Sequence, residues 1–263
     1  MKTIYGSLPF YDSLIKQDRV RTNAVVPVHC PRTKLPPFLI QVGTALVATV
    51  DSIKLVSCSG SETDITSGYF PSFPSVTASV ATALGYYIQY NGDTLSKNLP
   101  LGSYYVKVTK SDATYYSDWI NVWNMQNPLE RFCKIQFSNT NNLGDIRYEG
   151  SFVQMVWLEA VLNIPTHEMI QTGEEKDGVF LAEKIVSKYI YTIIAYVSRG
   201  LYRCLMRLTQ HDTITITDEV GNTYTPSIGN VIVEAPEWIG FDACKLTIKF
   251  NDDDNTAFGW VEL

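Results

Sequence analysis

Residues 132–162 display the pattern of hydrophobic and polar positions that recurs along this chain. Cys133, Ile135 and Phe137 alternate with polar residues, and this period of two predicts a strand with one face against a core. The run 152–162 is apolar on both faces. It predicts a strand covered on both sides, either in the middle of a domain or beneath a partner.

Short strand signals recur through residues 37–124 at the spacing of a β-sandwich. Asn91-Gly92-Asp93 predicts a hairpin turn, because Asn-Gly tolerates the positive φ of a type I′ turn. Residues 57–74 are rich in Ser, Gly and Thr and predict a loop or a weak edge strand. The expected strands of this domain are 46–50, 53–56, 86–90, 104–108 and 115–122.

A second β domain is expected over residues 125–263, after a boundary at Asn127-Pro128. The turn 173–178, with its Asp-Gly reversal, predicts a hairpin. The β-branched and aromatic run 188–196 predicts another covered strand. One short helix is predicted near 198–210, with Ser198 as its N-cap and an apolar stripe of leucines and Cys204.

Residues 1–36 contain Pro9, Pro27, Pro31 and Pro36 without sustained periodicity. Because proline cannot donate to a central ladder, this segment is predicted to be an extended N-terminal arm along a surface or a sheet edge. A first edge strand plus a loop of the following domain is an equal alternative. The fold class predicted from these patterns is mainly β, as two consecutive β-sandwich domains with one short α-helix in the second.

Composition narrows the class of protein further. Apolar residues make up 45% of the 263 residues and aromatic residues 12%, which suits sheets of a globular protein. The formal charge is -6 and the 21 basic residues are scattered, so direct nucleic-acid binding is not expected. No apolar run reaches the length of a membrane helix, and the N-terminus turns polar too early for a signal peptide. An aqueous, reducing compartment without membrane contact is expected.

The residues that commonly carry chemistry are dispersed. Five cysteines at wide spacing, without a CxxC pair, are predicted to be buried hydrophobic residues rather than metal ligands: Cys30, Cys58, Cys133, Cys204 and Cys244. The histidines His29, His167 and His211 lie in three different segments. For His211, capping of the helix end or simple exposure is favoured over catalysis.

Charged clusters are similarly interpreted as solvated. Glu174, Glu175 and Asp177 and the run 252–254 are expected in turns, with weak calcium binding as the minor alternative. Arg199, Arg203 and Arg207 form a basic row that favours a solvated helix face over contact with an acidic partner or nucleic acid. Nucleotide, acyl-transfer and zinc-protease motifs are absent from the sequence. No catalytic, cofactor-binding or metal residue is predicted, and the chain is not expected to be an enzyme.

Several short sequence segments along the chain resemble those of a known protein family. In the first domain they are 35–40, 99–107 and 115–119, and in the second 135–139, 144–148, 173–178 and 211–216. Together they resemble virion structural proteins of tailed bacteriophages, specifically the tail and tail-ring proteins of crAss-like phages of Bacteroidales hosts. All of these segments belong to expected structural elements and none is a reactive motif, so the resemblance implies no catalytic residue and no cofactor.

The resemblance implies immunoglobulin-like β domains assembled as a homo-oligomeric ring in the tail barrel or tail hub, beneath the portal. Such a protein links neighbouring tail, portal or ring proteins, is assembled in the host cytoplasm, and surrounds a lumen through which genome DNA can pass. Trp119, Trp123 and Trp157 are candidate interface anchors, with plain core as the alternative for Trp157. The rival functions are a carbohydrate-binding or adhesin module, in which Trp119 stacks on a sugar, and a hydrolase with an Asp and Glu site.

Overall fold

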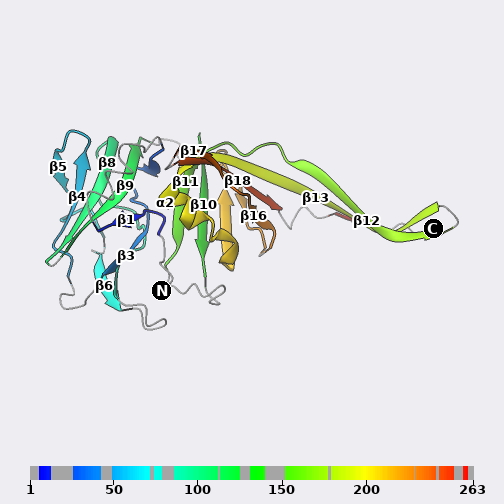
Figure 1. Cartoon of the computed structure of the whole chain (residues 1–263), viewed down its shortest axis with the longest axis horizontal. Helices are drawn as coiled ribbons and strands as arrows, with labels where there is room; N and C mark the ends of the chain where they lie inside the picture. The colour runs from blue at the N-terminus through cyan, green and yellow to red at the C-terminus, as the bar shows by residue number, and fades with distance from the viewer. Residues whose placement is uncertain are drawn as a thin grey trace.

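The computed structural model describes most of the chain. The described residues are 6–12, 26–42, 49–71, 74–78, 86–111, 113–124, 131–139, 152–176, 179–227, 229–240, 243–251 and 257–259. They form three sheets, one α-helix and one 3-10 helix (Figure 1). The prediction of a mainly β fold with a short helix is confirmed.

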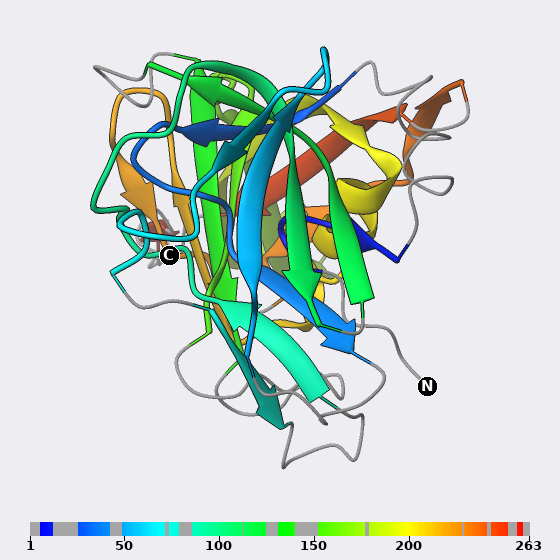
Figure 2. The same ribbon diagram turned by 90° about the vertical axis from the view of Figure 1, so that its left-hand side faces the viewer.

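The largest sheet contains ten strands of the described chain. They are β1 (Phe10–Tyr11), β2 (Val28–Pro31), β4 (Ser52–Ser57), β5 (Glu62–Asp64), β8 (Gly102–Lys110), β9 (Ala113–Trp123), β10 (Phe132–Ser138), β11 (Gln154–Glu159), β14 (Thr213–Thr217) and β15 (Thr223–Tyr224). Their order is β15-β14-β10-β11-β2-β9-β8-β4-β5, with β1 also paired to β9. We call this the first sheet; β4, β8 and β9 face the viewer in Figure 2.

The second sheet contains β12 (Thr166–Lys176), β13 (Val179–Ser198), β16 (Val231–Val233), β17 (Glu237–Ile239), β18 (Ala243–Asn251) and β19 (Ala257–Gly259). Its order is β12-β13-β18-β16, with β17 on β18 and β19 on β13. The third sheet has the order β3-β7-β6 and consists of β3 (Phe38–Val42), β7 (Tyr86–Tyr90) and β6 (Ser75–Ala78).

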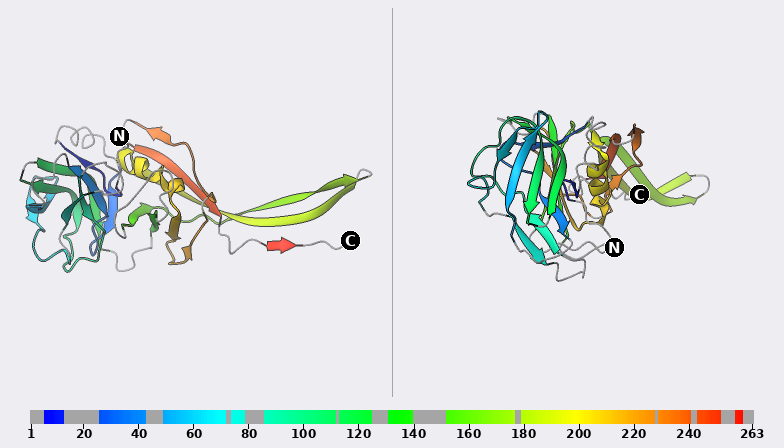
Figure 3. Two further views of the ribbon diagram at one scale, coloured as in Figure 1. Left: turned by 90° about the horizontal axis from the view of Figure 1, so that it is seen from below. Right: turned by 60° about the vertical axis from the view of Figure 1, so that its left-hand side comes forward.

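The strands β12 and β13 leave the body of the molecule as a long ribbon, and the short strand β19 pairs with residues 185–187 of β13. Figure 1 and the left view of Figure 3 show this ribbon extending far beyond the first and third sheets. At its other end β13 pairs with β18 along Ile190–Ser198 and so is anchored in the body. We call β12 together with residues 179–187 of β13 the ribbon.

One hydrophobic core joins the three sheets. Buried side chains of β3 and β7 belong to the same cluster as those of β4 and β8, and this cluster continues through β10, β11 and β14 into β13 and β18. The first sheet contains strands from both predicted domains. Its strand β2 pairs with β9 of the first domain on one side and with β11 of the second domain on the other. The division into domains at residues 37–124 and 125–263 stays a prediction, since residues 125–130 lie outside the described residues.

The predicted helix is confirmed as α2 (Arg199–Leu205), followed by η2 (Leu208–Gln210). Ser198 is its N-cap, since its Oγ accepts a hydrogen bond from the Leu201 amide at 3.2 Å. The same hydroxyl donates to Oδ2 of Asp118 at 3.0 Å, and the Tyr11 hydroxyl donates to Oδ1 of Asp118 at 2.9 Å. The buried carboxylate of Asp118 in β9 therefore ties the first sheet to the end of β13.

The alternation predictions largely hold. Cys133, Ile135 and Phe137 of β10 are buried, as predicted. The next strand, β11, has β10 and β2 as its neighbours in the sheet, and its side chains are buried on both faces, as predicted. Strands are present at 53–56, 86–90, 104–108 and 115–122, and residues 57–74 contain only the short edge strand β5. The expected strand 46–50 lies mostly outside the described residues.

Two strand predictions are wrong. Asn91-Gly92-Asp93 does form a turn, with Gly92 at φ +74°, but it closes no hairpin, because β7 pairs with β3 and β6. The run 188–196 is not covered on both faces, since Ile194 and Tyr196 are exposed. Burial alternates along this part of β13, so only one face contacts the core.

The expected surface or edge position of the N-terminal segment is wrong for its described residues. Leu8 is fully buried, and the buried Ser7 hydroxyl donates to Oε1 of Gln154 at 2.6 Å. The strand β2 pairs in parallel with β9 and also contacts β11, so it is central. This is possible because Pro27 precedes β2 and Pro31 ends it, so neither proline removes a donor from the middle of the strand.

Candidate interaction surfaces

The ribbon is the first candidate surface. Its strands pair from Thr166 opposite Ile190 to Lys176 opposite Val179, with a register shift between Thr172 and Gly173. β12 is the terminal strand of the second sheet, so its outer edge faces away from β13. The hairpin prediction is thus confirmed, but Glu174 and Glu175 lie in a strand rather than in the predicted turn. Asp177 and residues 252–254 lie outside the described residues.

An apolar face of the second sheet is the second candidate surface. The register places Tyr196 beside Lys245 and Lys245 beside Glu237, and the side chains of alternate residues share this face. We call it the outer face; its exposed apolar residues are Ile194, Tyr196, Ile232 and Ile239. Two ion pairs lie among them, Lys245–Glu237 at 3.2 Å and Lys249–Glu234 at 2.6 Å. The outer face therefore combines exposed apolar residues with paired charges.

The opposite face of the same strands is the core face. Ile193, Ala195 and Val197 of β13 are buried there, together with Leu246 and Ile248 of β18. A sheet with one buried face normally presents polar residues on the other. Exposed isoleucine and tyrosine on the outer face depart from that pattern and are typical of a surface that contacts a partner.

A cleft forms where the outer face meets the first sheet, and it is the third candidate surface. Its volume is about 580 Å³. The first sheet and the segment before β2 contribute Val26, Pro27, His29, Asn121, Trp123 and Glu159, while the second sheet contributes Tyr196, Ile239 and Ala243. His29 lies opposite Asn121 on β9 and opposite Trp157 on β11, and Glu159 follows Trp157 by two residues on the same face.

The His29 imidazole links two walls of this cleft. Trp123 Nε1 donates to His29 Nδ1 at 2.9 Å, and His29 Nε2 lies 3.6 Å from the carboxylate of Glu159. An indole nitrogen can only donate, so Nδ1 is the acceptor and the neutral ring carries its proton on Nε2. Burial lowers the pKa of His29, and this outweighs the opposing effect of Glu159. The imidazole is therefore neutral at pH 7.

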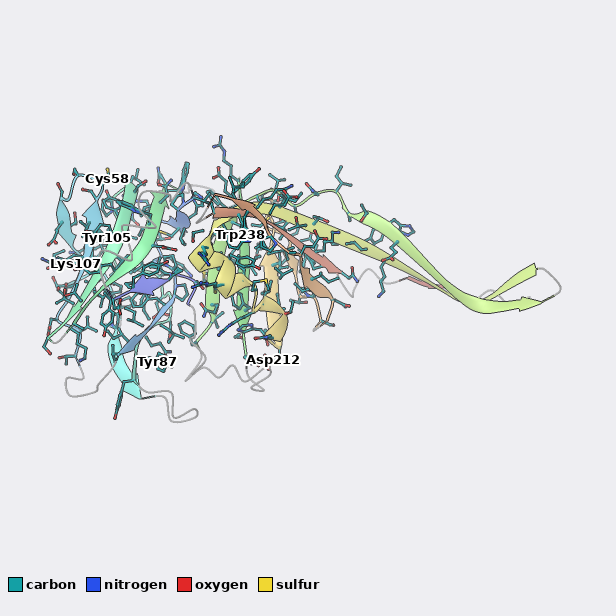
Figure 4. All side chains as sticks on the ribbon, in the orientation of Figure 1. Cys58, Tyr87, Tyr105, Lys107, Asp212 and Trp238 are labelled. Atoms are coloured by element: carbon teal, nitrogen blue, oxygen red, sulfur yellow. The ribbon has the colours of Figure 1, made fainter. Side chains whose placement is uncertain are left out.

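Of the predicted basic row, Arg199 and Arg203 lie on α2, whereas Arg207 lies after the helix as the N-cap residue of η2. The Arg199 guanidinium lies 5.8 Å from the ring centre of Trp238, which also packs edge-on against Tyr202. Trp238 is 48% exposed, and Figure 4 shows it beside α2. The carbonyl of Arg207 instead accepts a hydrogen bond from His211 Nδ1 at 2.7 Å. Trp238 was not singled out by the sequence patterns, because a lone tryptophan in a three-residue strand gives no periodic signal.

The remaining sequence candidates are placed as follows. Trp119 is half-buried and edge-on to Tyr105, while Trp157 is core, as its alternative interpretation proposed. His211 is buried and caps the helix end, which confirms the capping interpretation. His167 contacts Tyr189 at the base of the ribbon, with the ring centres 5.3 Å apart.

Four cysteines are buried as predicted, but Cys58 is exposed in the β4–β5 turn, where that prediction is wrong. Burial raises the pKa of the Cys133 and Cys204 thiols to about 12 and that of Cys244 to about 11, so these are protonated at pH 7. Among the described residues, no group of three or more His, Cys, Asp or Glu side chains is placed to hold a metal ion.

Comparison of the chain with protein-family models, with curated proteins and with solved structures gives no match. Within the described parts of the chain, no helix has the length and apolarity needed to cross a bilayer. The functional interpretation therefore depends on the three surfaces described above.

Proposed function

We propose that this protein is a structural component of a tailed-bacteriophage virion, which assembles as a homo-oligomeric ring in the tail barrel or tail hub and links neighbouring tail proteins. The ribbon is the observation that supports this most. Beyond the residues of β13 that pair with β19, the ribbon consists of two described strands. A two-stranded ribbon in water is marginally stable by itself, and an open strand edge is a template for pairing with another chain. Pairing of a neighbouring subunit with the outer edge of β12 would stabilise the ribbon and connect the subunits.

The outer face supports the same proposal. Exposed Ile194, Tyr196 and Ile232 lie at the root of the ribbon, on strands β13 and β16. A neighbour that pairs with the ribbon also approaches this apolar face, so both surfaces are covered by one assembly event. Head-to-tail contacts of this type close into a ring when the rotation between subunits divides the circle.

The immunoglobulin-like description of the two β domains is part of the proposal. The third sheet contributes Phe38, Ile40 and Ile88 to the same core as Ile53 and Val106 of the first sheet. Two sheets facing each other across one core are the architecture of a β-sandwich. This packing supports a sandwich for the first domain.

Shortening the ribbon tests the proposal. In the variant, residues 173–183 are replaced by Asn-Gly, which connects Thr172 to its partner Lys184 through a two-residue turn. We expect an unchanged thermal unfolding midpoint, because the buried residues of the described core lie outside the replaced segment, and loss of the ring in mass photometry and negative-stain microscopy. The control is Ser59→Glu in the exposed β4–β5 turn, which should assemble as the wild type does.

Two outcomes would contradict the proposal. One is a wild-type chain that stays monomeric at micromolar concentration and is absent from purified virions. The other is a shortened variant that assembles as well as the control.

A further inference from the structure

We infer that the cleft between the first sheet and the outer face binds the side chain of an arginine carried by a protein partner. Its walls combine the rings of Trp123 and Tyr196 with the carboxylate of Glu159. Tyr196 is 55% exposed and the Glu159 side chain 50% exposed, so both are accessible from solvent. Aromatic faces beside a carboxylate form the environment that a guanidinium prefers, because it stacks on rings and donates a pair of hydrogen bonds.

The charge of the cleft favours a cation. Among the described residues that line the cleft, Glu159 is the only acidic one, and none is lysine or arginine. His29 Nε2 lies 3.6 Å from its carboxylate, and the imidazole is neutral because burial lowers its pKa. Within the part of the chain that the structure describes, the Glu159 charge therefore has no cationic partner, and it borders a largely apolar cleft, where electrostatic attraction is stronger than in bulk water.

The hydrogen-bonding groups of the cleft favour arginine over a neutral polar ligand. The indole N–H of Trp123 is committed to His29 Nδ1, and the remaining imidazole proton on Nε2 faces Glu159. Two donors of the cleft are thus directed at groups of the protein itself, while the acceptor oxygens of Glu159 remain accessible. Arginine supplies five donors and accepts none, so it complements this arrangement.

Other charged groups on the outer face do not compete for this role. Glu237 and Glu234 are paired with Lys245 and Lys249. Their carboxylates are already neutralised by lysine, whereas that of Glu159 is not. Glu234 therefore provides a matched control: a half-exposed carboxylate that follows β16 of the second sheet and lies outside the cleft.

Calorimetric titration of the full-length protein with the blocked peptide acetyl-Ser-Arg-Ser-amide tests the inference. The comparison ligand is the same peptide with citrulline, which has the shape of arginine without its charge. We expect the arginine peptide to bind at least about tenfold more tightly, the size of one charge-assisted contact. Glu159→Gln should abolish this preference, while Glu234→Gln should retain it. Thermal unfolding of both variants verifies that they are folded.

Three results would overturn the inference: equal affinity for the two peptides, no heat with either, or a preference that survives Glu159→Gln. A further arm uses methyl β-galactoside, and binding of this sugar without preference for arginine would favour the carbohydrate-binding alternative. The inference does not depend on ring formation. A shortened ribbon that still assembles leaves it intact, and a failed peptide titration leaves the assembly proposal intact.

Discussion

The two buried histidines make the stability of this protein depend on pH. Burial lowers the pKa of His29 despite Glu159, and it lowers the pKa of His211 despite the carbonyls of Arg207 and Leu208. Between these lowered values and 6.5, the unfolded chain binds more protons than the folded one. The contribution of the two neutral histidines to the free energy of unfolding is therefore fully present above pH 6.5, and it decreases as the pH falls below that value.

Urea unfolding at pH 7.5 and pH 5.5 measures this effect. We expect a lower free energy of unfolding at pH 5.5, with a difference of up to about 1.4 kcal/mol for each histidine, because pH 5.5 lies one unit below the pKa of histidine in the unfolded chain. His29→Gln and His211→Gln should each reduce the difference, and the double variant should reduce it most. An unchanged difference in the double variant would show that other groups cause the pH dependence.

Gly200 permits the close approach of α2 to the first sheet. A Cβ added at this position would lie 2.7 Å from Oδ2 of Asp118 and 2.7 Å from Cγ of Pro9. We expect Gly200→Ala to lower the free energy of unfolding by about 1–3 kcal/mol, as overpacking does. The better helix propensity of alanine, worth about 1 kcal/mol, offsets only part of this loss.

Urea denaturation checks this prediction, with Thr209→Ala on the exposed side of η2 as the control. The control should stay within about 0.5 kcal/mol of the wild type. A Gly200→Ala variant as stable as the wild type would mean that the helix and β9 can separate without loss of packing.

At the scale of elements, Asp218 organises the turn between β14 and β15. Its Oδ1 accepts hydrogen bonds from the amides of Val220, Gly221 and Asn222, and its Oδ2 accepts from the side chains of Asn222 and Tyr224. Burial alone would raise the pKa of this carboxyl, but the hydrogen bonds outweigh it and lower the pKa. The ionised carboxylate is thus the form that holds the hairpin.

Asp218→Ala should lower the free energy of unfolding by about 2–3 kcal/mol, because it leaves several turn amides without their acceptor. Val220→Ala is the matched control in the same turn, since Val220 is 79% exposed and should change stability by less than about 0.5 kcal/mol. Equal stability of the two variants in urea would contradict this account of the turn.

Local signals predicted the elements whose determinants are local. Ser198 and the apolar stripe specify α2, and alternation specifies β10. The Asn91-Gly92 turn has the same local chemistry as a hairpin turn, yet Tyr90 pairs with Phe38 of β3 instead. The choice of partner depends on packing between segments far apart in the chain, which turn residues do not encode.

At the scale of the whole molecule, the cleft could not be predicted from the sequence. His29 and Trp123 are 94 residues apart, and Glu159 and Tyr196 come from two further strands. The arrangement depends on the insertion of β2 between β9 and β11. The prolines at the two ends of β2 had predicted an edge position for this strand. Trp123 was predicted as an anchor and does line the cleft, but its partners required the topology.

The ribbon is also longer than the hairpin that the sequence predicted. The Asp-Gly reversal predicted a hairpin, whereas the β-structure continues through Gly173, Glu174 and Glu175. Glycine and clustered carboxylates favour turns over strands by local preference. Strand pairing along the whole ribbon overrides that preference, and pairing with a neighbouring subunit would reinforce it.

Amide hydrogen exchange of the ribbon, compared between assembled particles and the unassembled chain, tests the central claim most directly. We predict that amides of Thr166–Lys176 exchange at least about tenfold more slowly in the assembled state, because strand addition to β12 protects them. Amides of the edge strand β5 serve as the internal control and should exchange equally in both states. Equal exchange of β12 in both states, in particles that contain the protein, would contradict assembly through the ribbon.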